Sequence, residues 1–137
     1  MPGLNHGRAQ ANLIYEFKRD DRFDVVSELA LQLGSQPRTP DLSIFPKRTI
    51  DWDNDVVRET TVPLAVVEIF SPQQGYLDVM EKVAEYLEAG VKSVWVLVPP
   101  LRTITIYHAQ EPPKTFSEGK AIDPATGLEV EVGAVFS

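Results

Sequence analysis

Two continuous apolar runs dominate the hydrophobic pattern of this chain. The runs at 64–70 and 93–98 are almost entirely apolar, and they stop at Pro72 and Pro99 respectively. Apolar runs of this length that end at a turn signal are typical of strands covered on both faces. We therefore predict that these two segments form the centre of a buried sheet.

Helical periodicity appears in two other segments, 6–19 and 75–89. Spacings of three and four residues bring the apolar residues of each segment onto one face. The first stripe contains Ala9, Leu13, Ile14 and Phe17, and the second contains Leu77, Met80, Val83, Ala84 and Leu87. Gly90 follows the second segment at a position where helices commonly end. We predict a helix over each range, with Leu77 on the buried face of the second.

Shorter alternating segments predict the rest of the sheet. We expect strands at 24–33, 39–45 and 103–107, and short strands at 115–116, 120–122 and 128–130. A right-handed crossover through the second helix would make the strands at 64–70 and 93–98 parallel. The earlier strands can pair as an antiparallel meander, 103–107 can pair as an edge or hairpin partner, and 46–63 forms a long polar connection. The pattern predicts an α/β fold, with a mixed β-sheet flanked by helices.

Composition restricts the class of protein. The chain has 137 residues, which suits one domain, and we expect residues 1–137 to form a single domain. It has no cysteine, which excludes disulfides and thiolate metal sites. No apolar run approaches the roughly 20 residues of a membrane span, and the N-terminus lacks a basic-then-apolar signal pattern. We therefore expect a cytoplasmic protein without a membrane partner.

The net charge of −7 argues against a protein that coats nucleic acid through a basic face. It does not exclude an enzyme that contacts phosphates locally. Part of the acidity lies in the run Asp51-Trp52-Asp53-Asn54-Asp55. We interpret this run as a solvated loop, because it lacks the glycine and the distal glutamate of a calcium-binding loop.

One carboxylate interrupts the first apolar run. An ionised Glu68 in a strand covered on both faces would cost several kcal/mol unless a cation, a basic side chain or a metal compensated its charge. Asp41 stands at the start of a predicted strand, and Lys82 lies off the apolar stripe of the following helix. Two carboxylates on neighbouring strands can hold a magnesium ion. A nearby lysine can orient or deprotonate the attacking water and stabilise charge on a phosphate.

The same residues carry a resemblance to a known family. Pro40-Asp41, followed by a strand that contains Glu68, resembles the PD-(D/E)XK nuclease superfamily and, more narrowly, the Uma-type family of restriction-endonuclease-like proteins. The resemblance covers residues 5–107 in the expected order. The superfamily places its lysine two residues after the glutamate, where this chain has Phe70. In the family the lysine has moved to the following helix, which points to Lys82. The other matching positions are Thr39, Leu42-Ser43-Ile44-Phe45, Val66-Val67, Ile69, Ser71-Pro72, Asp78, Glu81, Tyr86, Ala89-Gly90-Val91, Trp95 and Val98-Pro99.

The resemblance implies a restriction-endonuclease-like fold and a metal-dependent endonuclease that hydrolyses phosphodiester bonds of nucleic acid, with DNA as the expected substrate. Asp41, Glu68 and Lys82 would be its catalytic residues. Mg²⁺ or Mn²⁺ would be held by Asp41, Glu68 and the backbone carbonyl of Ile69, and Glu28 would be an accessory acidic residue. The resemblance also implies a homodimer, in which two sites would serve the two strands of a duplex.

Simpler interpretations remain open for each of these residues. Asp41 can cap backbone amides of its own turn, and Glu68 can form a purely structural ion pair with Lys82 or an arginine. Lys82 can pair with an acidic neighbour on a solvated helix face, Glu28 can be an exposed strand residue, and His6 at the helix start is expected to be solvated. For the whole protein, the alternatives are a catalytically inactive interaction or assembly domain of the same fold and a phosphoesterase of small molecules.

Overall fold

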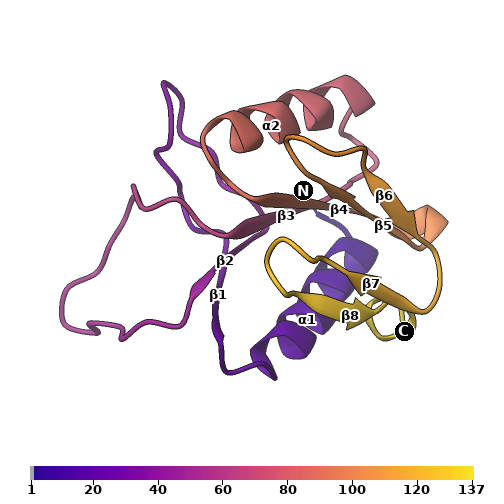
Figure 1. Ribbon diagram of the computed structural model, residues 1–137, viewed down its shortest axis with the longest axis horizontal. Helices are drawn as coiled ribbons and strands as arrows, with labels where there is room; N and C mark the ends of the chain where they lie inside the picture. The colour runs from indigo at the N-terminus through magenta and orange to yellow at the C-terminus, as the bar shows by residue number, and fades with distance from the viewer. Residues whose placement is uncertain (1) are drawn as a thin grey trace.

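A six-stranded mixed sheet, with one helix across each face, is the centre of the computed structural model, which describes residues 2–137 (Figure 1). The sheet has the strand order β1-β2-β3-β4-β5-β6, and its strands are β1 (Phe23–Ser27), β2 (Leu42–Pro46), β3 (Ala65–Ile69), β4 (Ser93–Val98), β5 (Thr103–Tyr107) and β6 (Lys114–Phe116). A separate hairpin contains β7 (Lys120–Ile122) and β8 (Glu129–Glu131), and the helices are α1 (Leu4–Lys18), α2 (Tyr76–Glu88), the 3₁₀ turn η1 (Pro99–Leu101) and α3 (Val132–Val135).

Strand pairing agrees with the expected topology. The strands β3 and β4 are parallel neighbours, and α2 forms the crossover between them. The strands β1, β2 and β3 form the predicted antiparallel meander. β5 pairs with both β4 and β6, so it is a hairpin partner but not the edge of the sheet. The predicted mixed α/β fold is therefore confirmed.

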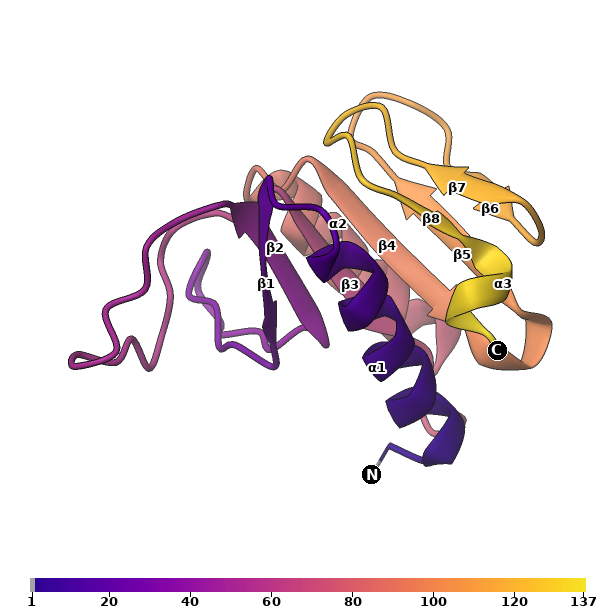
Figure 2. The ribbon, with the colours of Figure 1, turned by 90° about the horizontal axis from the view of Figure 1, so that it is seen from below.

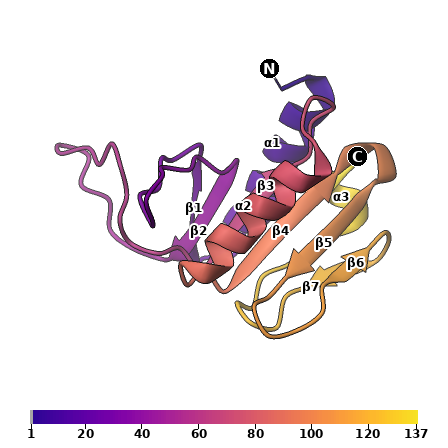
Figure 3. The same ribbon diagram turned by 90° about the horizontal axis from the view of Figure 1, so that it is seen from above.

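Side chains of the central strands alternate between two apolar cores. Val67 and Trp95 face α1, seen in front of the sheet in Figure 2, whereas Val66 and Val94 face α2, seen in front of it in Figure 3. In the first core the rings of Phe17 and Trp95 meet edge to face, with 5.2 Å between their centroids. Because both faces are covered, nearly every position of β3 and β4 must be apolar, which explains the continuous runs in the sequence.

The strand predicted over 24–33 is shorter than expected. It ends at Ser27, and Glu28 adopts a left-handed backbone conformation with a φ of 51°. This conformation interrupts the pleat, which continues only as an isolated bridge of Leu31 with Arg38 and Glu59. The break matters for the site, since the segment after Glu28 turns toward α2 and does not extend the sheet.

The buried face of α2 also differs from the expectation. Val79, Val83 and Tyr86 are its buried residues, whereas Leu77 is 79% exposed. Leu77 lies two residues before Val79 and therefore about 200° away around the helix, on the opposite side. The prediction that Gly90 ends the helix is confirmed, because this glycine has a φ of 103° and donates its N–H to the carbonyl of Leu87.

The connection between β2 and β3 projects away from the sheet (Figure 2). Residues 51–58 are exposed, as expected of a solvated acidic run, and Trp52 is 90% exposed. The base of the connection is attached to the sheet through Arg48, whose guanidinium contacts Asp24 and Glu59 at 2.8 Å each. Within residues 2–137, no helix has both the length and the apolar character needed to cross a membrane.

A fully buried carboxylate, Asp123, joins the C-terminal hairpin to the sheet. It accepts hydrogen bonds from the indole of Trp95 at 3.1 Å, the imidazole of His108 at 3.0 Å and the hydroxyl of Thr126 at 2.8 Å. Burial acts to raise the pKa of Asp123, but these hydrogen bonds outweigh it and hold the pKa below its ordinary value. The ionised carboxylate therefore stabilises the fold at neutral pH.

Replacing this carboxylate should destabilise the protein in a pH-dependent way. Asp123→Ala leaves buried donors unpaired, so its free energy of unfolding at pH 7 should fall by about 3 kcal/mol. Since the folded pKa lies below the unfolded value of about 3.9, the stabilisation is lost as the pH falls through the folded pKa, and the difference from wild type should shrink there. Urea unfolding followed by circular dichroism measures both effects. The exposed Asp21→Ala serves as control, and a difference independent of pH would contradict this account.

Candidate active site

Asp41 is held from three directions at the start of β2. Its Oδ2 accepts the backbone N–H of Ile69 at 2.7 Å, and its Oδ1 lies 3.2 Å from Nε2 of His6. Its backbone carbonyl accepts the side-chain amide of Gln10 and the N–H of Glu28, each at 3.1 Å. The carboxylate therefore contacts residues from β3 and α1, and not the amides of its own turn as the capping interpretation required.

His6 lies beside Asp41, a placement that the sequence interpretation considered but did not favour. It is only 9% exposed, so the expectation of a solvated histidine is wrong. Its Nδ1 is buried without a hydrogen-bond partner, while its Nε2 faces Asp41. His6, Ala9, Leu13 and Phe17 form the buried face of α1, so His6 extends the apolar stripe by one step toward the N-terminus. This spacing was the available signal, since a polar residue on a buried stripe needs a partner.

Glu68 lies near the C-terminal end of the fully buried strand β3 and receives its partners from α2. It is 5% exposed; its Oε2 accepts the hydroxyl of Tyr86 at 2.8 Å, and its Oε1 lies 3.8 Å from Nζ of Lys82. Burial raises the pKa of Glu68 to about 7; the Lys82 charge and the Tyr86 hydrogen bond oppose the rise, and the negative charge of Asp41 adds to it. The carboxyl therefore changes its protonation state near neutral pH.

Asp41 and Glu68 lie on the same face of the sheet. In the antiparallel pairing of β2 and β3, Leu42 is opposite Val67, so continuing the register by one residue places Asp41 opposite Glu68. Directly opposed residues on antiparallel strands project from the same face, and this one is covered by α2. The influence of Asp41 on the pKa of Glu68 agrees with this proximity. The strand pairing thus brings the two predicted carboxylates together.

The remaining predicted residues surround this pair. Lys82 precedes Tyr86 by one turn of α2, so both reach the same carboxylate. The N–H of Ile69 points to the side of β3 where β2 begins, and its carbonyl lies on that same side because the two groups of one strand residue share a direction. Glu28 adjoins Asp41 through its backbone, but its side chain is exposed.

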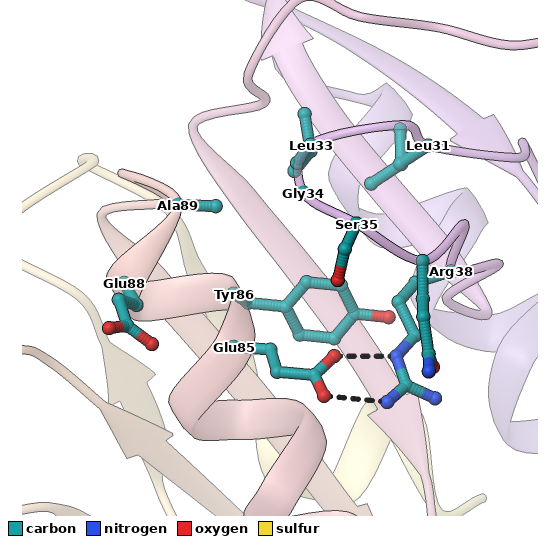
Figure 4. A pocket seen from close by; sticks show the side chains of 10 residues that line it. Leu31, Leu33, Gly34, Ser35, Arg38, Glu85, Tyr86, Glu88 and Ala89 are labelled. Carbon is teal, nitrogen blue, oxygen red and sulfur yellow. Dashed lines mark hydrogen bonds and ion pairs between the residues drawn. The ribbon is translucent and has the colours of Figure 1, made fainter.

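Tyr86 joins this carboxylate pair to a second ion pair. Burial and the charge of Glu68 hold the pKa of Tyr86 far above its ordinary value, so its hydroxyl remains a hydrogen-bond donor. Beside it, the guanidinium of Arg38 binds Glu85 through two hydrogen bonds of 2.6 and 2.7 Å (Figure 4). The charge of Arg38 acts to lower the pKa of Glu68. Over residues 2–137, no three or more His, Cys, Asp or Glu side chains gather into a metal-binding group.

A comparison with protein families identifies the chain. The model of the Uma2 family, described as "Putative restriction endonuclease", matches residues 1–135. The chain belongs to the Uma2 family. The family expected from the residues around Asp41 and Glu68 is thus confirmed.

Structural comparison extends this result to the fold. The crystal structure of a protein described as "a putative nuclease belonging to DUF820", from Anabaena variabilis ATCC 29413, superposes with a TM-score of 0.80 and 22% sequence identity. The match covers 99% of this chain and 82% of that chain, so the two proteins share a fold. A comparison with curated proteins finds no match.

Because the pKa of Glu68 is raised, we predict that the free energy of unfolding of the metal-free protein depends on pH near neutrality. A carboxyl with a folded pKa of about 7 binds its proton more tightly in the folded state. Its stabilisation is full below the unfolded pKa and is lost as the pH rises through the folded pKa. Glu68→Gln stays neutral, so its free energy of unfolding should gain about 3 kcal/mol relative to wild type between about pH 4 and pH 8.

Urea unfolding across this pH range in EDTA measures the difference. Glu81→Gln, at an exposed position of α2, should follow the wild-type pH profile. A constant difference between Glu68→Gln and wild type would show that Glu68 does not titrate as described.

Proposed function

We propose that this Uma2-family chain is a magnesium-dependent endonuclease that hydrolyses phosphodiester bonds of nucleic acid, with DNA as the expected substrate. The observation that carries the proposal is the convergence of Asp41, Glu68 and Lys82 at one place between β2, β3 and α2. These residues come from three separate elements of the chain, and a purely structural ion pair at Glu68 would not require Asp41.

The donor set suits a magnesium ion. Two carboxylates placed side by side repel each other, and this repulsion contributes to the raised pKa of Glu68. A divalent cation held by Asp41, Glu68 and the carbonyl of Ile69 would relieve it. Oδ2 of Asp41 accepts the N–H of Ile69 and Oδ1 lies 3.2 Å from Nε2 of His6, but each carboxylate oxygen has a second lone pair available. Magnesium commonly uses one or two carboxylates and completes its shell with water and phosphate oxygens, which agrees with a site of so few protein ligands.

When bound, the metal would lower the pKa of a coordinated water and neutralise negative charge on the substrate phosphate. The chain's own residues account for the rest of the proposed chemistry. Lys82 is 27% exposed and therefore reaches both Glu68 and solvent, where its ammonium can attract a phosphate and orient the attacking water. Tyr86 holds one oxygen of Glu68, which leaves the other to face Lys82.

A cleavage assay tests this proposal. Fluorescent single- and double-stranded DNA should be cut by the wild-type protein in Mg²⁺ or Mn²⁺ and not in EDTA. Asp41→Asn and Glu68→Gln should each lower the rate by at least about 100-fold, because each removes a charged ligand of the proposed metal ion. Lys82→Met should lower it by a similar order, because it removes the cation proposed to attract the phosphate and orient the water.

Two variants are matched controls for that assay. Asp78→Asn and Lys92→Met remove a charge at exposed positions and should leave the rate within a factor of about two of wild type. Cleavage that persists in both carboxylate variants would reject the site, and absence of any cleavage would favour an inactive assembly domain. Hydrolysis of small phosphodiesters without cleavage of DNA would favour a phosphoesterase.

His6 should act as a positioning residue for Asp41. Groups that orient a metal-binding carboxylate typically change metal affinity by about 10- to 100-fold when removed. We expect His6→Leu to weaken Mn²⁺ binding by about that factor in isothermal titration calorimetry, and His6→Gln, which retains a donor, to lose less. Unchanged Mn²⁺ affinity in a folded His6→Leu protein would show that the histidine only fills space.

A further inference from the structure

A cavity of about 370 Å³ lies between α2 and the loop at 31–38 (Figure 4). We infer that this cavity, hereafter the base pocket, receives an unpaired nucleobase from a nucleotide adjacent to the scissile phosphate. The inference rests on the proposed function and narrows the substrate to nucleic acid with an unpaired base at the cleavage point.

The base pocket is a preformed part of the fold. The bridge between Leu31 and Arg38 closes its loop wall, with N–H to carbonyl distances of 2.7 and 3.0 Å. The two short hydrogen bonds from Arg38 to Glu85 then attach this wall to α2. A cavity whose walls are fixed in this way can take up a ligand with little loss of conformational entropy.

Tyr86 makes the base pocket continuous with the proposed site of hydrolysis. Its ring lines the cavity, while its hydroxyl donates to Glu68 at 2.8 Å. Lys82, Tyr86 and the C-cap residue Ala89 follow one another at i, i+4 and i+7, and therefore lie along one face of α2 and its C-cap. A phosphate bound near Lys82 would have its neighbouring base one sugar away, in the direction of Ala89.

The charges of the lining argue against a phosphate in the cavity itself. Among the described residues, Arg38 is the one cation that lines it, and Glu85 already neutralises that charge. Glu88 also contributes to the lining, so the formal charge there is +1 − 2 = −1. An anion would be repelled, whereas a neutral heterocycle would not.

The other lining groups suit a flat ring with apolar faces and a polar edge. Leu31 and Leu33 contribute apolar surface from the loop, opposite Ala89 on the helix. Ser35 and Gln36 add a hydroxyl and an amide, which can both donate to and accept from the edge of a base. A base that is stacked and paired in a duplex cannot enter such a pocket without first leaving the helix, so we expect unpaired nucleotides to be preferred.

Filling the cavity provides the test. Ala89→Leu fills it from the C-cap of α2, and Ser35→Leu fills it from the loop. Ala84→Leu makes the same change on an exposed face of α2 and is the matched control. None of these positions belongs to the proposed catalytic set.

The readout is binding without turnover. Fluorescence anisotropy in EDTA compares an oligothymidylate of about eight nucleotides with an abasic deoxyribose-phosphate oligomer of equal length and charge. Wild type and Ala84→Leu should bind the thymidylate about tenfold more tightly than the abasic oligomer, and both filled variants should lose this preference. Equal binding of the two probes by wild type, no measurable binding, or retention of the preference in both filled variants would overturn the inference.

The two proposals fail separately. If the wild-type protein does not cleave DNA, the endonuclease proposal is rejected. A base preference that disappears in Ala89→Leu and Ser35→Leu would still support binding of a base in the pocket. Conversely, cleavage that depends on Asp41 and Glu68, without any base preference in binding, would support the endonuclease proposal and reject the proposal of a base-binding pocket.

Discussion

The buried carboxylate of Glu68 is the constraint on which the rest of the site depends. A strand covered on both faces has no water to solvate this charge, so its partners must come from the protein itself. The Tyr86 hydroxyl and the Lys82 ammonium contact its two oxygens, and they do not fully compensate burial and the charge of Asp41. The ionised form of Glu68 is therefore unfavourable at neutral pH, and a bound cation would stabilise it.

The parallel pairing of β3 and β4 explains why these partners come from α2. Parallel neighbours require a crossover, and the right-handed crossover lays its helix over the face from which Glu68 projects. Phe70, two residues after Glu68, packs against the apolar core beneath α2. The Lys82 amine reaches the Glu68 carboxylate from α2. This helix therefore provides the Lys82 cation, the Tyr86 hydrogen-bond donor and one wall of the base pocket.

The two faces of the sheet have different tasks. The α1 face holds the larger apolar core and the buried Asp123, which connects the C-terminal hairpin to Trp95. The α2 face carries the charged groups, with Arg38 and Glu85 beside them. His6 is the exception, because the first turn of α1 reaches Asp41 at the start of β2. This division lets a stable core tolerate repulsion between carboxylates on the opposite side.

The sequence by itself determined the central strands, both long helices and the carboxylate of Glu68 inside a buried strand, because apolar periodicity and a charge inside an apolar run are local signals. It also indicated Lys82, through the resemblance to the Uma2 family. Only the tertiary structure decided that Glu28 breaks β1, that Leu77 faces solvent and that His6 approaches Asp41. Each of these depends on contacts between residues far apart in the chain. Helical spacing defines a stripe, but the neighbouring elements decide which stripe is buried and which polar residue on it finds a partner.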